Sequence, residues 1–205
     1  MLLTGLSLGG LGGFNSQWLL DFIFTFRDAH SAPQPAKIGE APIDAIVDRI
    51  IKVESDGDPN LKNKRSSAMG LGQFLNETWL DLIRTHRPDL AREHTEDEIL
   101  ELRRDLNIAR EVTVRFTEQN ANMLRKRSLP VTPGTLYLAH FAGGAGAVAI
   151  LSALENSDAA SVMAGADATG RTNREKLIKA NPFLERFTVA DLKNWAHRKM
   201  VISPR

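Results

Sequence analysis

The chain has 205 residues, 42% hydrophobic side chains and a net charge of +1. This length and composition are ordinary for a globular protein that buries one sizeable core, and the small net charge gives no global attraction to an anionic polymer. The absence of cysteine excludes disulfides and thiolate metal sites, and it is compatible with both reducing and oxidising compartments.

Residues 1–36 differ from the rest, and we interpret them as a leader before a domain formed by residues 37–205. Leu and Gly dominate its first third, an apolar run follows from Trp18 to Phe26, and residues 32–36 form a linker with two prolines. This pattern indicates an export signal or a segment that adheres to a membrane. The lack of Lys and Arg before the apolar run, and Asp21 within it, favour instead a helix packed on the domain or an unstructured segment. Both interpretations stay open.

The first strong helical pattern ends on an acid. Ile43, Val47 and Ile50 are spaced by four and three residues, and Glu54 follows four residues later. In a helix these side chains share one face, so the Glu54 carboxylate would lie on the apolar stripe. Gly57 then breaks the helix, and a loop rich in glycine and serine follows. A helix that ends on an inward acid beside such a loop predicts one wall of a cleft.

Apolar periodicity and capping signals predict further helices along the chain. Thr95 with Glu98 is spaced as a reciprocal capping pair, as is Thr172 with Glu175. The predicted helices lie within residues 93–104, 107–127, 135–141 (after Thr132-Pro133) and 145–154, beyond Thr172, and from Thr188 through Met200. No alternating run of β-branched residues is long enough to predict a sheet. The sequence therefore predicts an all-α domain.

The loop after the first helix carries a motif. Glu54-Ser55 is followed by Pro59, by Gly70-Leu71-Gly72-Gln73 and by Thr78-Trp79. The order and approximate spacing of these residues resemble the signature of the lysozyme-like lytic transglycosylases and muramidases, the SLT type of catalytic domain. The resemblance implies a lysozyme-like helical fold with a substrate cleft, and it implies that Glu54 is the catalytic acid. The candidate substrate-binding residues on this loop are Ser55, Ser67, Gln73 and Phe74, although Phe74 and Trp79 are more typical of packing than of stacking on a sugar.

The acid has to meet a chemical requirement. To break a β-1,4 glycosidic bond, it protonates the leaving oxygen, so it must keep its proton near neutral pH. Apolar surroundings disfavour a charged carboxylate, as they do at the acid of lysozyme itself. Glu54 fits this role because it continues an apolar stripe. Asp56 and Asp58 follow in a loop and are expected to point to solvent, and either of them stays open as an alternative nucleophile.

The resemblance implies a mechanism with a single carboxyl group. In that family the N-acetyl group of the substrate stabilises the anomeric carbon, and the same Glu then accepts a proton from the sugar 6-hydroxyl or from water. The first route gives a 1,6-anhydromuramyl end and the second a reducing end, and both stay open. No metal or cofactor is expected, because the five histidines show no ligand spacing.

A second candidate region runs from Tyr137 to Gly143. In the family, a helix with the sequence Ala-Tyr-Asn-Ala-Gly lines the cleft, and its Tyr contacts the catalytic carboxyl group. The aligned positions here hold His140 and Phe141, so the partner of Glu54 is either His140 or Tyr137, one helical turn earlier. Gly143 would allow a sugar to approach the backbone closely. We therefore name Tyr137, His140, Phe141 and Gly143 as candidate substrate-binding residues.

The resemblance implies cleavage of peptidoglycan strands between N-acetylmuramic acid and N-acetylglucosamine. Because this polymer lies outside the bacterial inner membrane, we expect an exported protein of the periplasm or cell envelope. It could serve wall remodelling, or open a gap for a secretion or envelope assembly. The alternative is a non-catalytic peptidoglycan-binding or scaffold protein on the same fold. Nucleic acid is not an expected partner, because no nucleic-acid motif accompanies the basic runs at residues 125–127 and 171–205.

Overall fold

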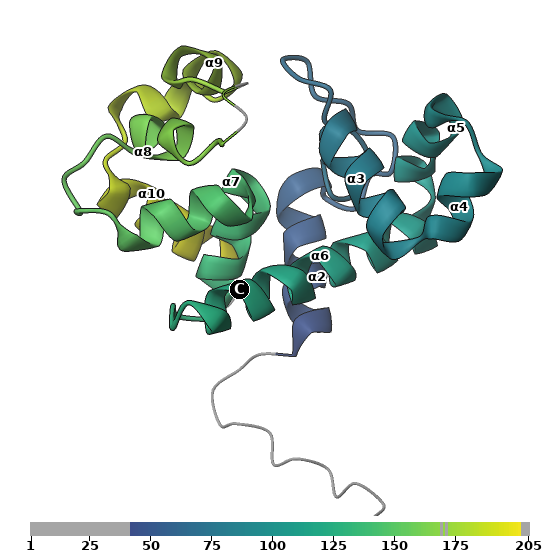
Figure 1. Cartoon of the computed structure of the whole chain (residues 1–205), viewed down its shortest axis with the longest axis horizontal. Helices are drawn as coiled ribbons and strands as arrows, with labels where there is room; N and C mark the ends of the chain where they lie inside the picture. The colour runs from purple at the N-terminus through teal and green to yellow at the C-terminus, as the bar shows by residue number, and fades with distance from the viewer. Residues whose placement is uncertain (1–41, 169, 171, 202–205) are drawn as a thin grey trace, which may run out of the picture. The chain divides into compact units, whose positions relative to one another are not determined.

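The computed structural model describes residues 42–168, 170 and 172–201, and the expected leader of residues 1–36 lies outside them. Regular structure in these described residues is helical, apart from isolated β-bridges. The predicted all-α class is therefore confirmed (Figure 1). The helices are α2 (Ile43–Ser55), α3 (Asn76–His86), α4 (Pro88–Glu93), α5 (Glu96–Glu101), α6 (Leu106–Lys126), α7 (Pro133–Ser152), α8 (Ala159–Gly165), α9 (Arg174–Ala180) and α10 (Val189–Met200), with 3-10 helices η1 (Leu102–Arg104) and η2 (Pro182–Arg186).

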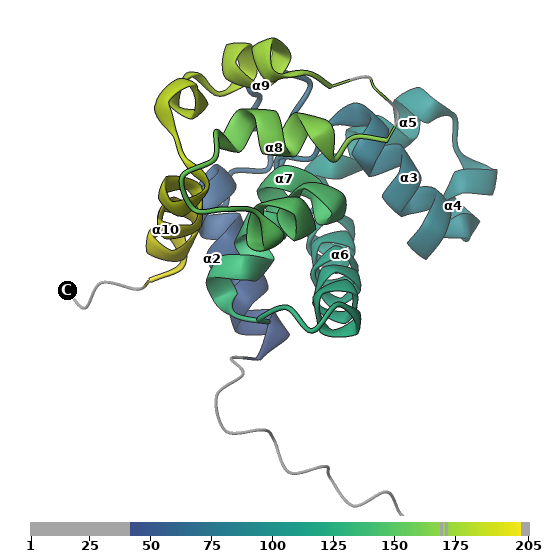
Figure 2. The same ribbon diagram turned by 60° about the vertical axis from the view of Figure 1, so that its left-hand side comes forward.

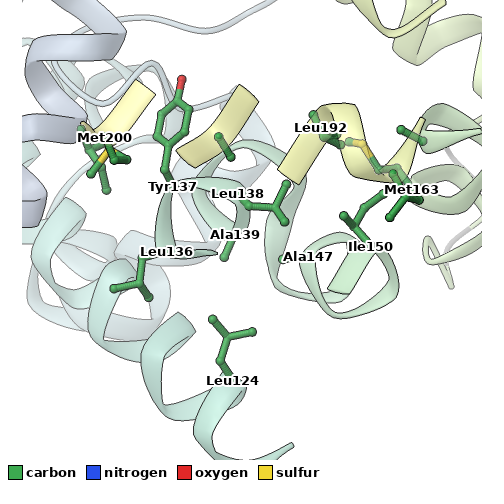
Figure 3. Packing of buried hydrophobic residues seen from close by; sticks show 14 of the residues in the cluster. Leu124, Leu136, Tyr137, Leu138, Ala139, Ala147, Ile150, Met163, Leu192 and Met200 are labelled. Atoms are coloured by element: carbon green, nitrogen blue, oxygen red, sulfur yellow. The ribbon is translucent and has the colours of Figure 1, made fainter. Parts of the chain in front are cut away.

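Two groups of buried side chains form the core, and α6 contributes to both. The larger group joins α2, α7, α8, α10 and the C-terminal part of α6, with Leu124, Leu138 and Leu192 among its members (Figure 3). The smaller group joins α3, α5 and the N-terminal part of α6, with Trp79 and Val112 among its members. Because α6 is a single helix that enters both groups, it connects them, and α2 contacts it on one side (Figure 2).

The helix that carries the acid forms as its spacing predicts. Val47 and Ile50 are fully buried in α2. Asp56 ends the helix in the left-handed conformation, with φ of 55°, and its N–H donates to the Lys52 carbonyl. Asp56 tolerates this conformation better than most residues because its side chain is short and polar. The turn brings the chain into the loop immediately after Glu54.

Three of the expected helix starts are confirmed. Thr95, Thr132 and Thr188 each lie at an N-cap and accept a hydrogen bond from the third amide of the helix, in a reciprocal capping box. The expected cap at Thr172 is wrong. Asn173 caps α9 instead, and the Thr172 amide donates to the Asp167 carboxylate at 2.7 Å. Two residues able to cap stand side by side here, and the helix starts one residue later than the sequence pattern suggested.

This correction allows a paired test of the caps. Thr188→Ala is expected to lower the free energy of unfolding by about 1 kcal/mol, because it leaves amides at the start of α10 without an acceptor. Thr172→Ala, one residue outside its helix cap, is expected to change it by less than about 0.5 kcal/mol. Urea unfolding followed by circular dichroism measures both. An equal loss for the two variants would contradict the cap assignment.

α7 contains a break where two separate helices were expected. Gly143 has φ of 71° and ψ of 164°, which is not helical, and it divides α7 between the predicted segments 135–141 and 145–154. A Cβ at the next residue, Gly144, would stand 2.8 Å from Met123 Sδ, so the chain approaches α6 closely there. α7 is long and apolar enough to cross a membrane by composition, but its buried residues form the centre of the larger core.

Candidate functional site

Glu54 lies in the last turn of α2 and is partly exposed. Its side chain lies beside the phenol of Tyr137 from α7, close enough for its charge to act on the hydroxyl. The Tyr137 ring packs in the larger core and is 3% exposed, and its hydroxyl points away from the neighbouring apolar side chains (Figure 3). Burial, followed by the charge and the hydrogen bond of Glu54, raises the pKa of Tyr137 far above its usual value. The phenol therefore keeps its proton and is able to act as a hydrogen-bond donor towards Glu54.

His140, the other candidate partner of Glu54, is engaged elsewhere. Its Nε2 atom lies 2.8 Å from the carbonyl oxygen of Gly72 in the motif loop. Because a carbonyl oxygen only accepts, Nε2 carries the hydrogen. The imidazole also packs against Phe74 and Phe116, with ring centroids 5.0 Å and 5.9 Å away. His140 thus joins α7 to the loop, while Tyr137 joins α7 to the acid.

Ser55 fixes the loop to the end of α2. Its side chain is buried, and its hydroxyl oxygen lies 2.9 Å from the Leu71 carbonyl and 3.1 Å from the Ile51 carbonyl. The same oxygen accepts a hydrogen bond from the Gly57 amide at 3.2 Å. All of these hydrogen bonds of the Ser55 hydroxyl are to backbone groups of the protein. Its role in this structure is to hold the residues on both sides of Glu54 in place.

Gln73 and Ser67 brace the loop from within. The Gln73 side-chain nitrogen donates to the carbonyls of Gly70 and Leu61, at 2.9 Å and 3.0 Å. The Ser67 hydroxyl accepts from the Asn76 amide, the first of α3, at 3.1 Å. These two candidate substrate-binding residues therefore use at least part of their hydrogen-bonding capacity to shape the loop.

Arg103 is a component of this loop that the sequence analysis did not identify. It is 3% exposed, and its guanidinium donates to the carbonyls of Ser67 and Phe74, at 2.9 Å and 3.1 Å. Burial lowers the pKa of Arg103, because the charged form loses water. Nothing in the sequence pattern separates it from Arg104 beside it, which is exposed.

The remaining residues considered in the sequence analysis have different surroundings. Phe74 is 4% exposed and packs in the smaller core, so its ring has almost no free surface on which a sugar could stack. Phe141 packs against Trp195 with a ring-centroid distance of 4.9 Å. Gly143 has open space where a side chain would stand. Asp56 and Asp58 are exposed.

The structure places its two described cavities away from Glu54. One has a volume of about 840 Å³ and is lined by residues of α3 and α6. The other has a volume of about 40 Å³ and is lined by residues of α2 and of the start of α7. Glu54, Tyr137 and His140 line neither cavity, so the cleft that the sequence pattern predicted beside the acid is not one of them. Within residues 42–168, 170 and 172–201, no group of three or more His, Asp or Glu side chains could hold a metal ion.

The contacts around Glu54 join the end of α2 and the motif loop that follows it to the first part of α7, which is distant in the sequence. Ser55, His140 and Gln73 hold the loop, and Tyr137 lies beside the acid. Comparisons with protein-family models and with curated proteins found no match. What Glu54 does is therefore inferred from its motif and its contacts.

Proposed function

We propose that the chain is a lysozyme-like glycosidase that cleaves the β-1,4 bond between N-acetylmuramic acid and N-acetylglucosamine in peptidoglycan, with Glu54 as its only acid and base. One observation carries the proposal: a partly exposed acid in the motif position lies beside a buried phenol whose pKa it raises. An acid that gives its proton to a substrate must be reachable and must be held in one orientation. Glu54 is reachable, and we propose that the neighbouring Tyr137 orients it.

The chemistry needs one carboxyl group. Glu54 donates its proton to the leaving oxygen as the bond from C1 to that oxygen breaks, and the acetamido oxygen of the muramic acid residue bonds to C1. The carboxylate then accepts a proton from the 6-hydroxyl or from water, whose oxygen attacks C1 and displaces the acetamido oxygen. Tyr137 is proposed to donate a hydrogen bond to Glu54 that strengthens when the carboxyl group is charged, so it stabilises the carboxylate between the two steps.

The rest of the motif serves this acid indirectly. Ser55 and Gln73 hold the loop beside Glu54, and His140 fixes the loop to α7. The mechanism uses no metal or cofactor. Its substrate lies outside the bacterial inner membrane, so the proposal includes a periplasmic or cell-envelope location, with wall remodelling or the opening of a gap for an envelope assembly as its purpose.

Analysis of the digestion products tests the proposed reaction. The full chain would be incubated with purified bacterial sacculi, and the soluble fraction analysed by mass spectrometry. We expect disaccharide-peptide fragments that end in muramic acid. Anhydro ends would identify a lytic transglycosylase, and reducing ends would identify a muramidase. Sacculi that stay intact at high protein concentration would contradict the proposal and support a binding or scaffold protein.

Tyr137→Phe tests the contribution of the phenol. The ring keeps its place in the core, and only the hydrogen bond to Glu54 is lost. We expect the rate of fragment release to fall about 10- to 150-fold, in line with roughly 1.5–3 kcal/mol for a hydrogen bond to a charged group. The substrate concentration at half-maximal rate should change little, because the phenol does not touch the sugar. An unchanged rate would show that the phenol has no part in the reaction.

A further inference from the structure

The cavity of about 840 Å³ lies on the surface of α6, next to the C-terminal end of α3. α3 and α6 contact each other, and Figures 1 and 2 both show them as neighbours. The lining includes two residues from the end of α3 and a row of polar residues along α6. Those that carry the inference are His86, Arg115, Glu118, Gln119, Lys126 and Arg127.

This cavity is separate from the surroundings of Glu54. Arg110 on α6 contacts α2 through Asp44 and Asp48, at 2.9 Å and 3.0 Å. An α-helix turns by about 100° per residue, so Gln119, nine positions after Arg110, lies on the opposite side of α6. The cavity therefore faces away from the helix that carries the acid.

The lining is rich in positive charge that the protein does not neutralise. Lys126 and Arg127 form no side-chain hydrogen bond or ion pair with another residue of the described part of the chain. Glu118 is the only acid in the lining, and its contact with Arg115 is 3.3 Å long between two side chains that are about half exposed. An exposed ion pair of this kind contributes little to stability. Arg115, Lys126 and Arg127 therefore remain available to a ligand.

The helix dipole accounts for only part of this charge. Lys126 and Arg127 lie at the C-terminal end of α6, where basic side chains are favoured. Arg115 lies in the middle of the same helix, where the dipole favours neither sign. His86 and Gln119 form a 3.1 Å hydrogen bond across the cavity wall, which fixes α3 and α6 relative to each other at this point.

We propose that this cavity binds a ligand with at least two carboxylate or phosphate groups. Guanidinium groups recognise both kinds of oxyanion with paired hydrogen bonds, and a lysine adds a mobile charge. The volume lies within the range of small-molecule sites. The inference does not involve Glu54, so it can be tested independently of the proposed glycosidase activity.

Calorimetric titration of the full chain with citrate and with inorganic pyrophosphate tests the site. We expect one binding site, weakened by added salt, and the tighter of the two probes identifies carboxylate or phosphate as the preferred group. In Arg115→Gln/Lys126→Gln the dissociation constant should rise about tenfold or more, equivalent to at least about 1.4 kcal/mol. The matched control Arg92→Gln/Lys179→Gln removes the same charge from exposed positions outside the cavity, and it should change the constant less than about twofold.

Two results would overturn the inference. If neither probe binds the unaltered chain, the cavity is not an anion site. If the control variant weakens binding as much as the cavity variant, the probes respond to overall charge and not to this cavity. Circular dichroism of both variants establishes that the substitutions leave the helices intact, which is expected because all four positions are on the surface.

Discussion

Glu54→Gln is expected to lower the rate of fragment release from sacculi by a factor of about 100 to 10,000. The amide has almost the same shape as the carboxyl group and still accepts the hydrogen bond of Tyr137, but it has no proton to give to the glycosidic oxygen. The variant should sediment with sacculi as the unaltered chain does. Release is measured by mass spectrometry of the soluble fraction, and binding by a pull-down of the same mixture.

Asp58→Asn is the matched control for this variant. It also replaces a carboxylate with an amide, four residues later in the chain. The position is exposed, and its side chain accepts a hydrogen bond from the Asn60 amide. The rate should stay within about threefold of the unaltered value, since surface substitutions have small effects. Equal losses for both variants would show that Glu54 is not the single acid. If Glu54→Gln releases fragments from sacculi at the unaltered rate, the proposed mechanism is contradicted.

Gly70→Ala is expected to lower the free energy of unfolding by about 2–5 kcal/mol. Gly70 has φ of 77°, which costs an alanine roughly 1–2 kcal/mol. A Cβ there would also stand 2.0 Å from the Arg103 carbonyl oxygen, and relieving such overpacking adds about 1–3 kcal/mol. We therefore expect the added methyl group to push the motif loop away from η1. Urea unfolding measures the change.

Gly57→Ala is the control that separates the two causes. Gly57 has a similar φ of 84°, but nothing lies within 4 Å of the position that a Cβ would take. We expect a loss of about 1–2 kcal/mol from the backbone conformation alone. If the two alanine variants unfold at the same urea concentration, the close approach of Gly70 to Arg103 is not a feature of the protein in solution.

Much of the fold follows from local sequence signals. The spacing of Val47 and Ile50 predicted the buried face of α2, and Thr95 and Thr188 predicted helix starts correctly, because a cap depends on residues within one turn. The same logic failed at Thr172, where Asn173 caps as well and the choice between neighbours depends on the surrounding chain.

The candidate site was less predictable because it is assembled by packing. Tyr137 and His140 share one face of α7, and the sequence could not decide which contacts Glu54 and which contacts the loop. Arg103 has no local signal at all, because its burial depends on how η1 packs under the loop. Phe74 lies in the motif that predicted substrate binding, but it is buried because it packs against Trp79 of α3, Phe116 of α6 and His140 of α7.

A crystal structure of Glu54→Gln with a peptidoglycan tetrasaccharide tests directly whether the side chain at position 54 contacts the glycosidic oxygen. The variant should hold the sugar without cleaving it. We expect a glycosidic oxygen within hydrogen-bond distance of the side-chain amide at position 54, with the amide still accepting from the Tyr137 hydroxyl. A tetrasaccharide bound elsewhere, with solvent alone around position 54, would contradict the assignment of Glu54 as the acid.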